Sequence, residues 1–417
     1  MLFFLKVLAF VLMGSCLGVV TGCTPGVHVN MVSILVIGVY ASSSLEPVLF
    51  AALVLSMAVV QTFLDILPAI FLGAPDPDTA LSILPGHRML LEGRGFEAVR
   101  LSAMGSLGSV MLAAGLALPM IVIIPAIYPV LSAVLFPLLL FLEASIIITE
   151  KTPRKMLYAL GIIGLSGFLG VLITSSGYMP TDKALFPALS GLFGISTLLL
   201  SSESGVEIPE QDLDAPVEID GLRMVKSIVV GFFAGMTTGI LPAVGSAQAT
   251  ILAQRVTRES DHRSFIVAVS GVNTGNMIFG LIALFTIGKA RNGAVKAVEA
   301  IMGGTIDFNT LALFIGVVLF CGGIGAVLTR LVGGVFARNI TRLPYTVLAR
   351  GIVAMITVLV VIVSGPKGLI VLFVSTFMGF LPPLLGVKRV HSMGFLMIPT
   401  LIYFSGYQSL LLGLLNL

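Results

Sequence analysis

Runs of hydrophobic residues dominate the chain, and short polar stretches separate them. A membrane-spanning helix needs about 20 consecutive apolar residues, which is the length of these runs. We therefore expect an all-α polytopic membrane protein with about nine to twelve membrane segments. In the first half of the chain the expected segments are 1–20, 47–72, 98–124, 129–149, 155–176 and 184–202. In the second half they are 224–241, 263–287, 309–335, 346–364, 366–383 and 392–415.

The composition supports a membrane protein. Hydrophobic residues make up 57% of the chain and charged residues 10%, whereas soluble domains carry about 25% charged residues. The net charge of +3 is too small to indicate a nucleic-acid partner. Three scattered cysteines, Cys16, Cys23 and Cys321, indicate neither a disulfide framework nor a zinc site. We expect a multi-pass protein of the cell (plasma) membrane.

One unusual stretch occurs twice. GSCLGVVTGCTPGVH, from Gly14, matches GFFAGMTTGILPAVG, from Gly231, at a constant spacing of 217 residues. The positions that match are Gly14 with Gly231, Gly18 with Gly235, Thr21 with Thr238, Gly22 with Gly239 and Pro25 with Pro242. The second copy has Ile240 where a lipoprotein cleavage signal would require the equivalent of Cys23. The stretch is therefore a repeated structural element and not a cleavage signal.

A second echo, that is, a further pair of similar stretches, extends the repeat. FLGAPDPDTA and FTIGKARNGA align with Gly73 and Gly288 at a spacing of 215 residues. The chain thus divides into a first repeat half, 1–202, and a second, 222–417. The segment 203–221 between them is acidic and reads as a solvated linker.

Repeats whose helices break at matching positions are typical of secondary transporters with inverted repeats. A break leaves free N–H groups and partial positive charge at the start of the following half-helix, which suits an anion. Two such breaks, facing each other near the membrane midplane, predict a polar substrate chamber. The residues expected there are Thr21, Gly22, Pro25, Gly26, Thr238, Gly239, Pro242 and Gly245.

Several motifs resemble the TctA family, the large membrane subunit of tripartite tricarboxylate transporters. They are TPGVHVN, FLGAPDPDTALSILPGHRMLLEGRGFEAV, RNITRLPYTVLARGI and GFLPPLLGVKRVHSMGFLMIP. The chain looks like a divergent, shorter member of this family. Its second break reads Pro242-Ala243 where the family has Pro-Gly, and its second loop is basic. The resemblance implies transport of a di- or tricarboxylate, with a small membrane subunit or a binding protein as partner. The Pro-Gly-Val motif also resembles polyprenyl-phosphate translocases, which gives a carrier-lipid flippase as the alternative function.

Polar residues near the breaks are further candidates for substrate binding. His28 can donate to an anion or titrate near neutral pH, or simply bond a backbone carbonyl. Asn30 either binds substrate or caps a half-helix, and Ser246 either binds substrate or joins two helices. Asn273 and Asn276 mark another polar break, where unpaired amides are costly in hydrocarbon.

Isolated charges complete the expected site. Asp65 lies deep in an apolar run and is expected to bind Na⁺ or carry a proton, or else to pair with a cation. Asp76 and Asp78 in the first loop are expected to form a gate with the second loop, where Lys289 and Arg291 suit an anionic head group. Both loops also fit water-exposed turns.

These patterns predict a secondary transporter for a small organic anion, coupled to Na⁺ or H⁺. No cofactor is expected, and the sequence allows a homodimer. Nucleophile elbows, HExxH motifs and P-loops are absent from the sequence, so we expect no enzymatic activity.

Overall fold

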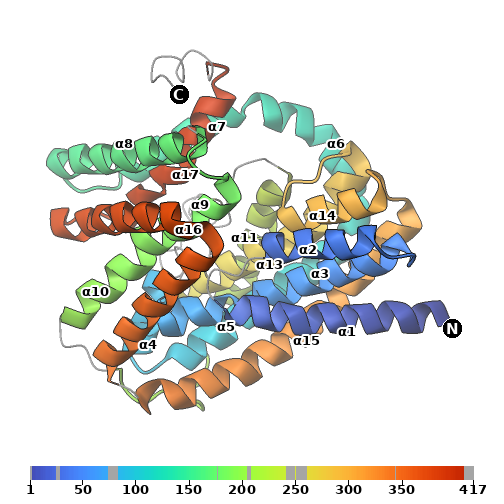
Figure 1. The fold of residues 1–417 in the computed structure, drawn as a ribbon, viewed down its shortest axis with the longest axis horizontal. Coiled ribbons are helices and arrows are strands. Elements are labelled where there is room, and N and C mark those ends of the chain that lie inside the picture. Colours follow the sequence, from blue (N-terminus) through green and yellow to red (C-terminus); the bar gives the residue numbers. More distant parts are fainter. Residues whose placement is uncertain are drawn as a thin grey trace. The chain divides into compact units, whose positions relative to one another are not determined.

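The computed structural model describes residues 2–24, 29–73, 83–175, 177–203, 208–240, 249, 261–342 and 344–407. These residues are almost entirely helical, and none of them forms a strand, which confirms the all-α class (Figure 1). The helices from the first half are α1 (Leu2–Cys23), α2 (Val29–Ala41), α3 (Pro47–Leu64), η1 (Pro68–Leu72), α4 (Ile83–Leu91), α5 (Gly95–Gly115), α6 (Ala117–Ala133), α7 (Leu135–Ile147), α8 (Pro153–Ser175), α9 (Thr181–Leu189), η3 (Ser190–Ile195) and α10 (Ser196–Glu203). Those from the second half are α11 (Gly221–Ile240), α13 (His262–Ile287), α14 (Gly293–Met302), α15 (Phe308–Asn339), η4 (Ile340–Arg342), α16 (Tyr345–Leu385), η5 (Arg389–Met393) and α17 (Gly394–Phe404).

Eight of the described helices are long and apolar enough to cross a membrane, or nine if α6 and α7 together form one broken span. This count meets only the lower end of the predicted range. The predicted segments 346–364 and 366–383 both form helices, which together make up α16 and are separated by a kink at Gly365. Gly365 has a φ of 69°, and Pro366 follows it; a left-handed glycine before proline accounts for the kink. The described residues of the last predicted segment, 392–415, include the end of η5 and the short helix α17.

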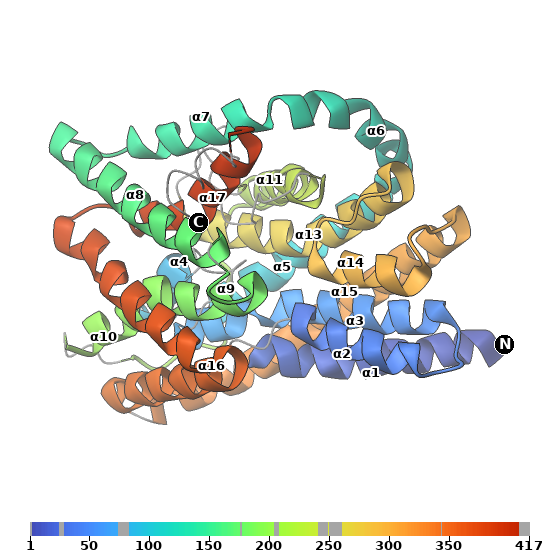
Figure 2. The same ribbon diagram turned by 45° about the horizontal axis from the view of Figure 1, so that its top comes forward.

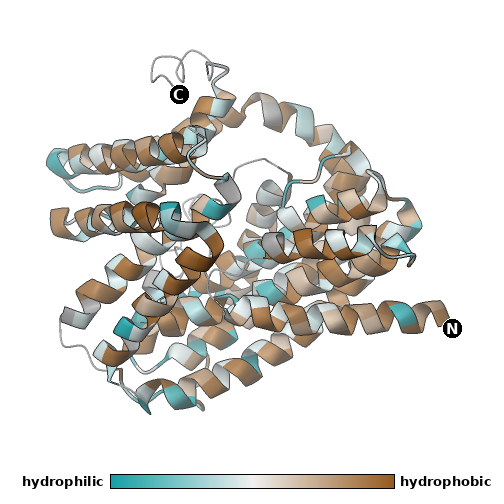
Figure 3. Ribbon diagram, viewed as in Figure 1, coloured by the Kyte–Doolittle hydropathy of each residue, from teal (hydrophilic) through white to brown (hydrophobic). Residues whose placement is uncertain are grey.

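Apolar side chains cover the outer surfaces of several long helices. Leu12 on α1, Leu331 on α15 and Phe373 on α16 are exposed, as are many of their neighbours. Figure 3 shows hydrophobic positions along most of the length of α1 and α15. A soluble monomer rarely exposes contiguous apolar patches of this kind. Together with the eight candidate spans, this surface makes the chain an integral, multi-pass membrane protein.

The described residues divide into two compact units. Unit 1 comprises the described residues of Met1–Leu72, Ser82–Pro129 and Glu207–Leu343, and unit 2 those of Gly73–Leu81, Val130–Val206 and Pro344–Leu417. Each unit draws on both predicted repeat halves. The division of the sequence into two halves around the linker stays a prediction, and so does the inversion of one half.

In unit 1, two helix pairs make equivalent contacts. Helix α1 packs on α3, and α11 packs on α13 (Figure 2). Both contacts depend on glycines, because backbones approach closely only where a side chain is missing. A Cβ on Gly18 would lie 2.6 Å from the carbonyl oxygen of Met57 in α3. A Cβ on Gly239 would lie 2.6 Å from the Cβ of Phe279 in α13.

The two pairs keep the spacing found in the sequence. Glycines 217 residues apart in α1 and α11 contact residues 215 apart in α3 and α13. The equivalent contacts are Gly14 with Leu53 and Gly231 with Ala268, Gly18 with Met57 and Gly235 with Val272, and Gly22 with Gln61 and Gly239 with Asn276. The loop glycines of the second echo also agree, since Gly73 and Gly288 have φ values of 60° and 62°. The repeated sequence therefore forms a repeated structure.

Unit 2 shows a second set of equivalent contacts, which the sequence comparison did not reveal. Here helices of one half pack on helices of the other. Gly191 approaches Leu372 and Ser375, and the equivalent contact is that of Gly394 with Ile163 and Ser166. Gly379 approaches Leu192 and Ser196, and the equivalent contact is that of Gly170 with Phe395 and Pro399. Matched partners are 203 residues apart in η3–α10 and α17, and 209 apart in α8 and α16. The same pattern of close approaches therefore occurs twice in unit 2.

Candidate functional site

The helices end where the repeated motif begins its polar stretch. Helix α1 ends at Cys23 and α2 begins at Val29, while α11 ends at Ile240. Thr21 and Thr238 occupy equivalent last turns, and their hydroxyls donate to the carbonyls of Gly18 at 3.3 Å and Gly235 at 3.0 Å. The backbone of Asn30 lies in α2. Eight expected residues lie outside the described part of the chain: Pro25, Gly26, His28, Asp76, Asp78, Pro242, Gly245 and Ser246.

Asp65 lies at an interruption of the buried helix α3. The helix ends at Leu64 with Asp65 as its C-cap residue, and the π-helical turn η1 follows from Pro68. Proline has no N–H to donate to the carbonyl four residues earlier, so the helix cannot continue regularly there. The Asp65 carboxylate is buried and accepts a hydrogen bond of 2.8 Å from the Asn273 amide of α13. The structure thus brings together two residues predicted from the sequence, one from each half.

A second amide contact extends this group toward the second loop. Asn276 lies one turn after Asn273 on buried α13 and accepts a hydrogen bond of 3.2 Å from the Asn292 amide. The Asn292 oxygen in turn accepts from the Val295 N–H and caps the start of α14. Gln61, the equivalent of Asn276 in α3, has a buried side-chain oxygen without a hydrogen-bond partner among the described residues.

Two cations of the second loop converge on one tyrosine. The Lys289 ammonium donates to the Tyr128 hydroxyl at 3.0 Å, and the Arg291 guanidinium donates to the same oxygen at 2.6 Å. The two nitrogens are therefore within 5.6 Å of each other. Both cations also lie over the Tyr128 ring, which attracts positive charge to its face. The Nε of Arg291 is buried, and no described residue accepts a hydrogen bond from it.

Like charges repel at this distance, and no carboxylate among the described residues pairs with either the exposed Lys289 or the half-buried Arg291. The group of Lys289, Arg291 and Tyr128 is therefore suited to hold an anion between the cations. Asn292 connects this group through Asn276 and α13 to Asn273 and Asp65. We refer to these seven residues together as the polar site of unit 1.

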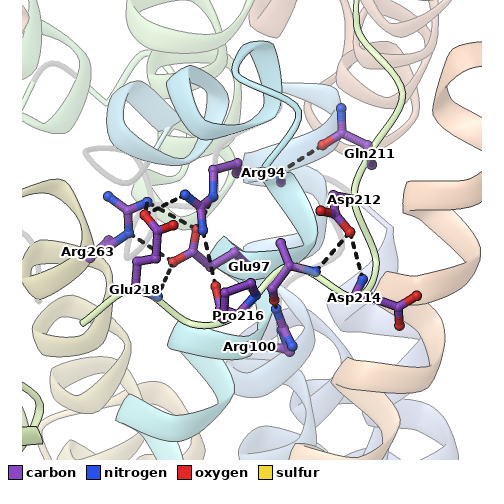
Figure 4. A network of polar contacts seen from close by, with 11 residues as sticks. Arg94, Glu97, Arg100, Gln211, Asp212, Asp214, Pro216, Glu218 and Arg263 are labelled. Atoms are coloured by element: carbon purple, nitrogen blue, oxygen red, sulfur yellow. Dashed lines mark hydrogen bonds and ion pairs between the residues drawn. The ribbon is translucent and has the colours of Figure 1, made fainter. Parts of the chain in front are cut away.

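A charged network elsewhere in unit 1 anchors the linker (Figure 4). The Glu97 carboxylate of α5 is fully buried and pairs with Arg94 at 2.7 Å and Arg263 at 2.9 Å. Both arginines also contact Glu218 of the linker, and the hydrogen bond from Arg94 holds the pKa of Glu218 below its usual range. Gln211 accepts a hydrogen bond from the Gly95 N–H at 2.8 Å. The linker thus exposes many of its side chains but is tied to α5 at several points.

Four of the residues described above were not predicted from the sequence: Tyr128, Asn292, Glu97 and Gln61. Tyr128 falls between two predicted spans, and only the folded structure places it against the second loop. Glu97 belongs to a motif, GRGFEAV, for which no specific role was predicted. Gln61 could have been found, because the 215-residue spacing that links Gly73 to Gly288 also links Gln61 to Asn276.

Comparison with known proteins agrees with this architecture. The model of the tripartite tricarboxylate transporter TctA family matches residues 8–394. An uncharacterized protein of Methanocaldococcus jannaschii is 26% identical over 406 residues, which cover 95% of this chain and 98% of the relative. No solved structure matches the chain. The chain belongs to the TctA family, the membrane components of tripartite tricarboxylate transporters.

Proposed function

We propose that this protein is a permease for a small organic anion, a di- or tricarboxylate, and that the polar site of unit 1 binds it. The observation that carries the proposal is the convergence of Lys289 and Arg291 on the Tyr128 hydroxyl. An arginine fork and an ammonium together match the oxygens of a carboxylate. Family membership supports transport as the activity, and the site supports an anion as the cargo.

The pair of Asp65 and Asn273 is the proposed coupling site. Ionisable residues at membrane depth are costly, and they usually mark ion or proton pathways. A carboxylate and amide oxygens are ligands that suit Na⁺, and the same carboxylate can carry a proton. Its position at the interruption of α3 supports a functional role, since helix irregularities of this kind often occur at such sites.

The proposed partners follow from the family. A binding protein would deliver the anion, and a small membrane subunit would accompany this chain in the plasma membrane. The alternative cargo is a polyprenyl-phosphate carrier lipid, because the same two cations also suit a phosphate.

A ligand screen on the purified protein tests the proposal. Melting temperatures in detergent are measured with citrate, succinate and a short-chain polyprenyl phosphate, each with and without Na⁺ and at two pH values. A ligand at about 100 times its dissociation constant stabilises by about 2.7 kcal/mol. We expect the carboxylates to raise the melting temperature of the wild type and not that of Arg291→Gln. Lys296→Gln removes an exposed charge from the same unit and serves as control. Stabilisation by the lipid phosphate alone would refute the carboxylate cargo.

A further inference from the structure

An arginine without a carboxylate partner among the described residues lies in unit 2. Arg389 begins the short helix η5 between α16 and α17 and is half-buried. Its Nη1 donates to the Ser196 hydroxyl at 3.1 Å and to the Thr197 hydroxyl at 2.7 Å. These two buried residues begin α10, directly after the π-helical turn η3. Both contacts join segments that are far apart in the sequence.

The hydroxyls hold the guanidinium but do not neutralise it. Each hydroxyl donates its own proton to a backbone carbonyl one turn earlier, Ser196 to Leu192 and Thr197 to Phe193. Their oxygens are therefore free to accept from Arg389, and they bring no negative charge.

Nearby acidic groups are engaged elsewhere. Glu150 receives hydrogen bonds from the His391 ring at 2.9 Å and the Lys388 N–H at 3.0 Å. No carboxylate in the described part of the chain pairs with Arg389. Partial burial of an uncompensated cation is unfavourable, and it lowers the pKa of Arg389 from its ordinary value.

The rest of the guanidinium is available for a ligand. The hydrogen bonds of Arg389 to described residues use Nη1 alone, so Nε and Nη2 have no hydrogen-bond partner among the described residues. Nε and Nη2 form the edge of the fork that bonds two oxygens of one anion. The contacts of Nη1 with Ser196 and Thr197 fix the orientation of this edge, so that little rotamer freedom remains to be lost on binding.

We propose that Arg389, oriented by Ser196 and Thr197, is a second anion-binding site of this protein. Its ligand is a group that offers two anionic oxygens on one side, either the carboxylate of a solute or the phosphate of an anionic lipid. The site belongs to unit 2 and does not depend on the polar site of unit 1.

The test compares binding to the wild type, Arg389→Gln, Arg389→Lys and Lys367→Gln. Lys367→Gln removes an exposed charge from the same unit and controls for net charge. Calorimetry with citrate and with inorganic phosphate measures solute binding in detergent. Native mass spectrometry after reconstitution with phosphatidylglycerol or phosphatidylcholine measures retained lipid. Melting temperature and gel filtration confirm that each variant is folded.

We expect Arg389→Gln to weaken binding of the solute or retention of phosphatidylglycerol by about tenfold or more. Arg389→Lys should give a smaller loss of about threefold, because a lysine keeps the charge but not the fork. Lys367→Gln should stay within about twofold of the wild type. If Arg389→Gln does not fold, the binding of Arg389→Lys is compared with that of the wild type instead.

Equal binding by the wild type and the Arg389 variants would overturn the proposal. So would the absence of any bound anion or anionic lipid in the wild type. Arg291→Gln separates the two sites: citrate binding that is lost in Arg291→Gln but kept in Arg389→Gln supports unit 1 alone. The reverse result supports the Arg389 site and contradicts the proposed function of Lys289 and Arg291.

Discussion

The amide of Asn273 donates a hydrogen bond of 2.8 Å to the carboxylate of Asp65. Asp65 ends α3 in the first half, and Asn273 lies within α13 in the second half. The contact therefore joins the two most buried helices of unit 1 at the point where α3 is interrupted. It gives the coupling hypothesis a specific pair of atoms.

We predict that Asp65→Asn removes the dependence of anion binding on Na⁺ or pH, because an amide neither titrates nor offers a negative charge to a cation. The stimulation by the coupling ion should fall at least about tenfold. Binding affinity measured across Na⁺ concentrations and pH values checks this. Asn273→Ala should weaken the ion effect, whereas Asn339→Ala, at an exposed position of α15, should leave it intact. An unchanged ion response in Asp65→Asn would rule out this carboxylate as the coupling site.

The equivalent helix pairs predict which glycines accept a methyl group. Gly18→Ala and Gly239→Ala would bring a Cβ within 2.6 Å of atoms of the facing helix. Each should destabilise the protein by about 1–3 kcal/mol, as overpacking does. Gly235→Ala meets its nearest neighbour at 3.4 Å, and Gly38→Ala meets nothing within 4 Å. These two variants should melt close to the wild type. Equal losses in all four would contradict the repeated close packing.

The buried carboxylate of Glu97 holds the linker to α5 through two arginines. Glu97→Gln leaves Arg94 and Arg263 with only the exposed Glu218, and we expect a loss of about 2 kcal/mol. This lies below the roughly 3–5 kcal/mol of a fully buried pair, because the two arginines are 22% and 21% exposed. Limited proteolysis at Glu210 should become faster in this variant. Glu92→Gln, which removes an exposed pair with Arg88, should cleave like the wild type.

Acid should destabilise unit 2 through His391. Burial lowers the pKa of this histidine below its ordinary value of 6.5, against the opposing effect of Glu150. The unfolded chain then binds the proton more readily, so stability is complete above pH 6.5 and falls as the pH drops toward the folded pKa. The slope approaches about 1.4 kcal/mol per pH unit in that window.

Glu150 adds a second loss at lower pH. Burial alone would raise its pKa, but the hydrogen bonds from His391 and Lys388 outweigh burial and lower it below 4.5. The contribution of Glu150 to folding stability is present above pH 4.5 and is lost as the pH falls through the pKa of Glu150 in the folded protein. Melting curves between pH 8 and pH 5 isolate the histidine. His391→Gln should flatten the decline, and an unaltered decline would assign it to other groups.

The sequence predicted those parts of the fold that depend on residue identity at short range. Glycines at helix contacts cannot be replaced freely, so the spacing of Gly14, Gly18 and Gly22 reappears in α11 and proves to be a repeat of contacts. The break before Pro366 likewise follows from local chemistry, and the structure has it as a kink at Gly365 between the two helical parts of α16.

Features that depend on tertiary approach were not predicted. Tyr128 contacts Lys289 and Arg291 across more than 160 residues, and no local pattern marks it as their partner. Gln61 and Asn276 occupy equivalent positions with different side chains, so identity alone does not pair them. The repeated contacts in unit 2 were not predicted for the same reason, because small residues and backbone carbonyls form them.

The most direct test of the account is the affinity for citrate measured by titration calorimetry, with and without the coupling ion, in the wild type, Arg291→Gln and Asp65→Asn. The account predicts that Arg291→Gln weakens binding by about tenfold or more at every ion concentration. It predicts that Asp65→Asn still binds citrate but no longer responds to the ion. If both variants bind citrate as the wild type does, with the same ion dependence, the polar site of unit 1 is not the transport site.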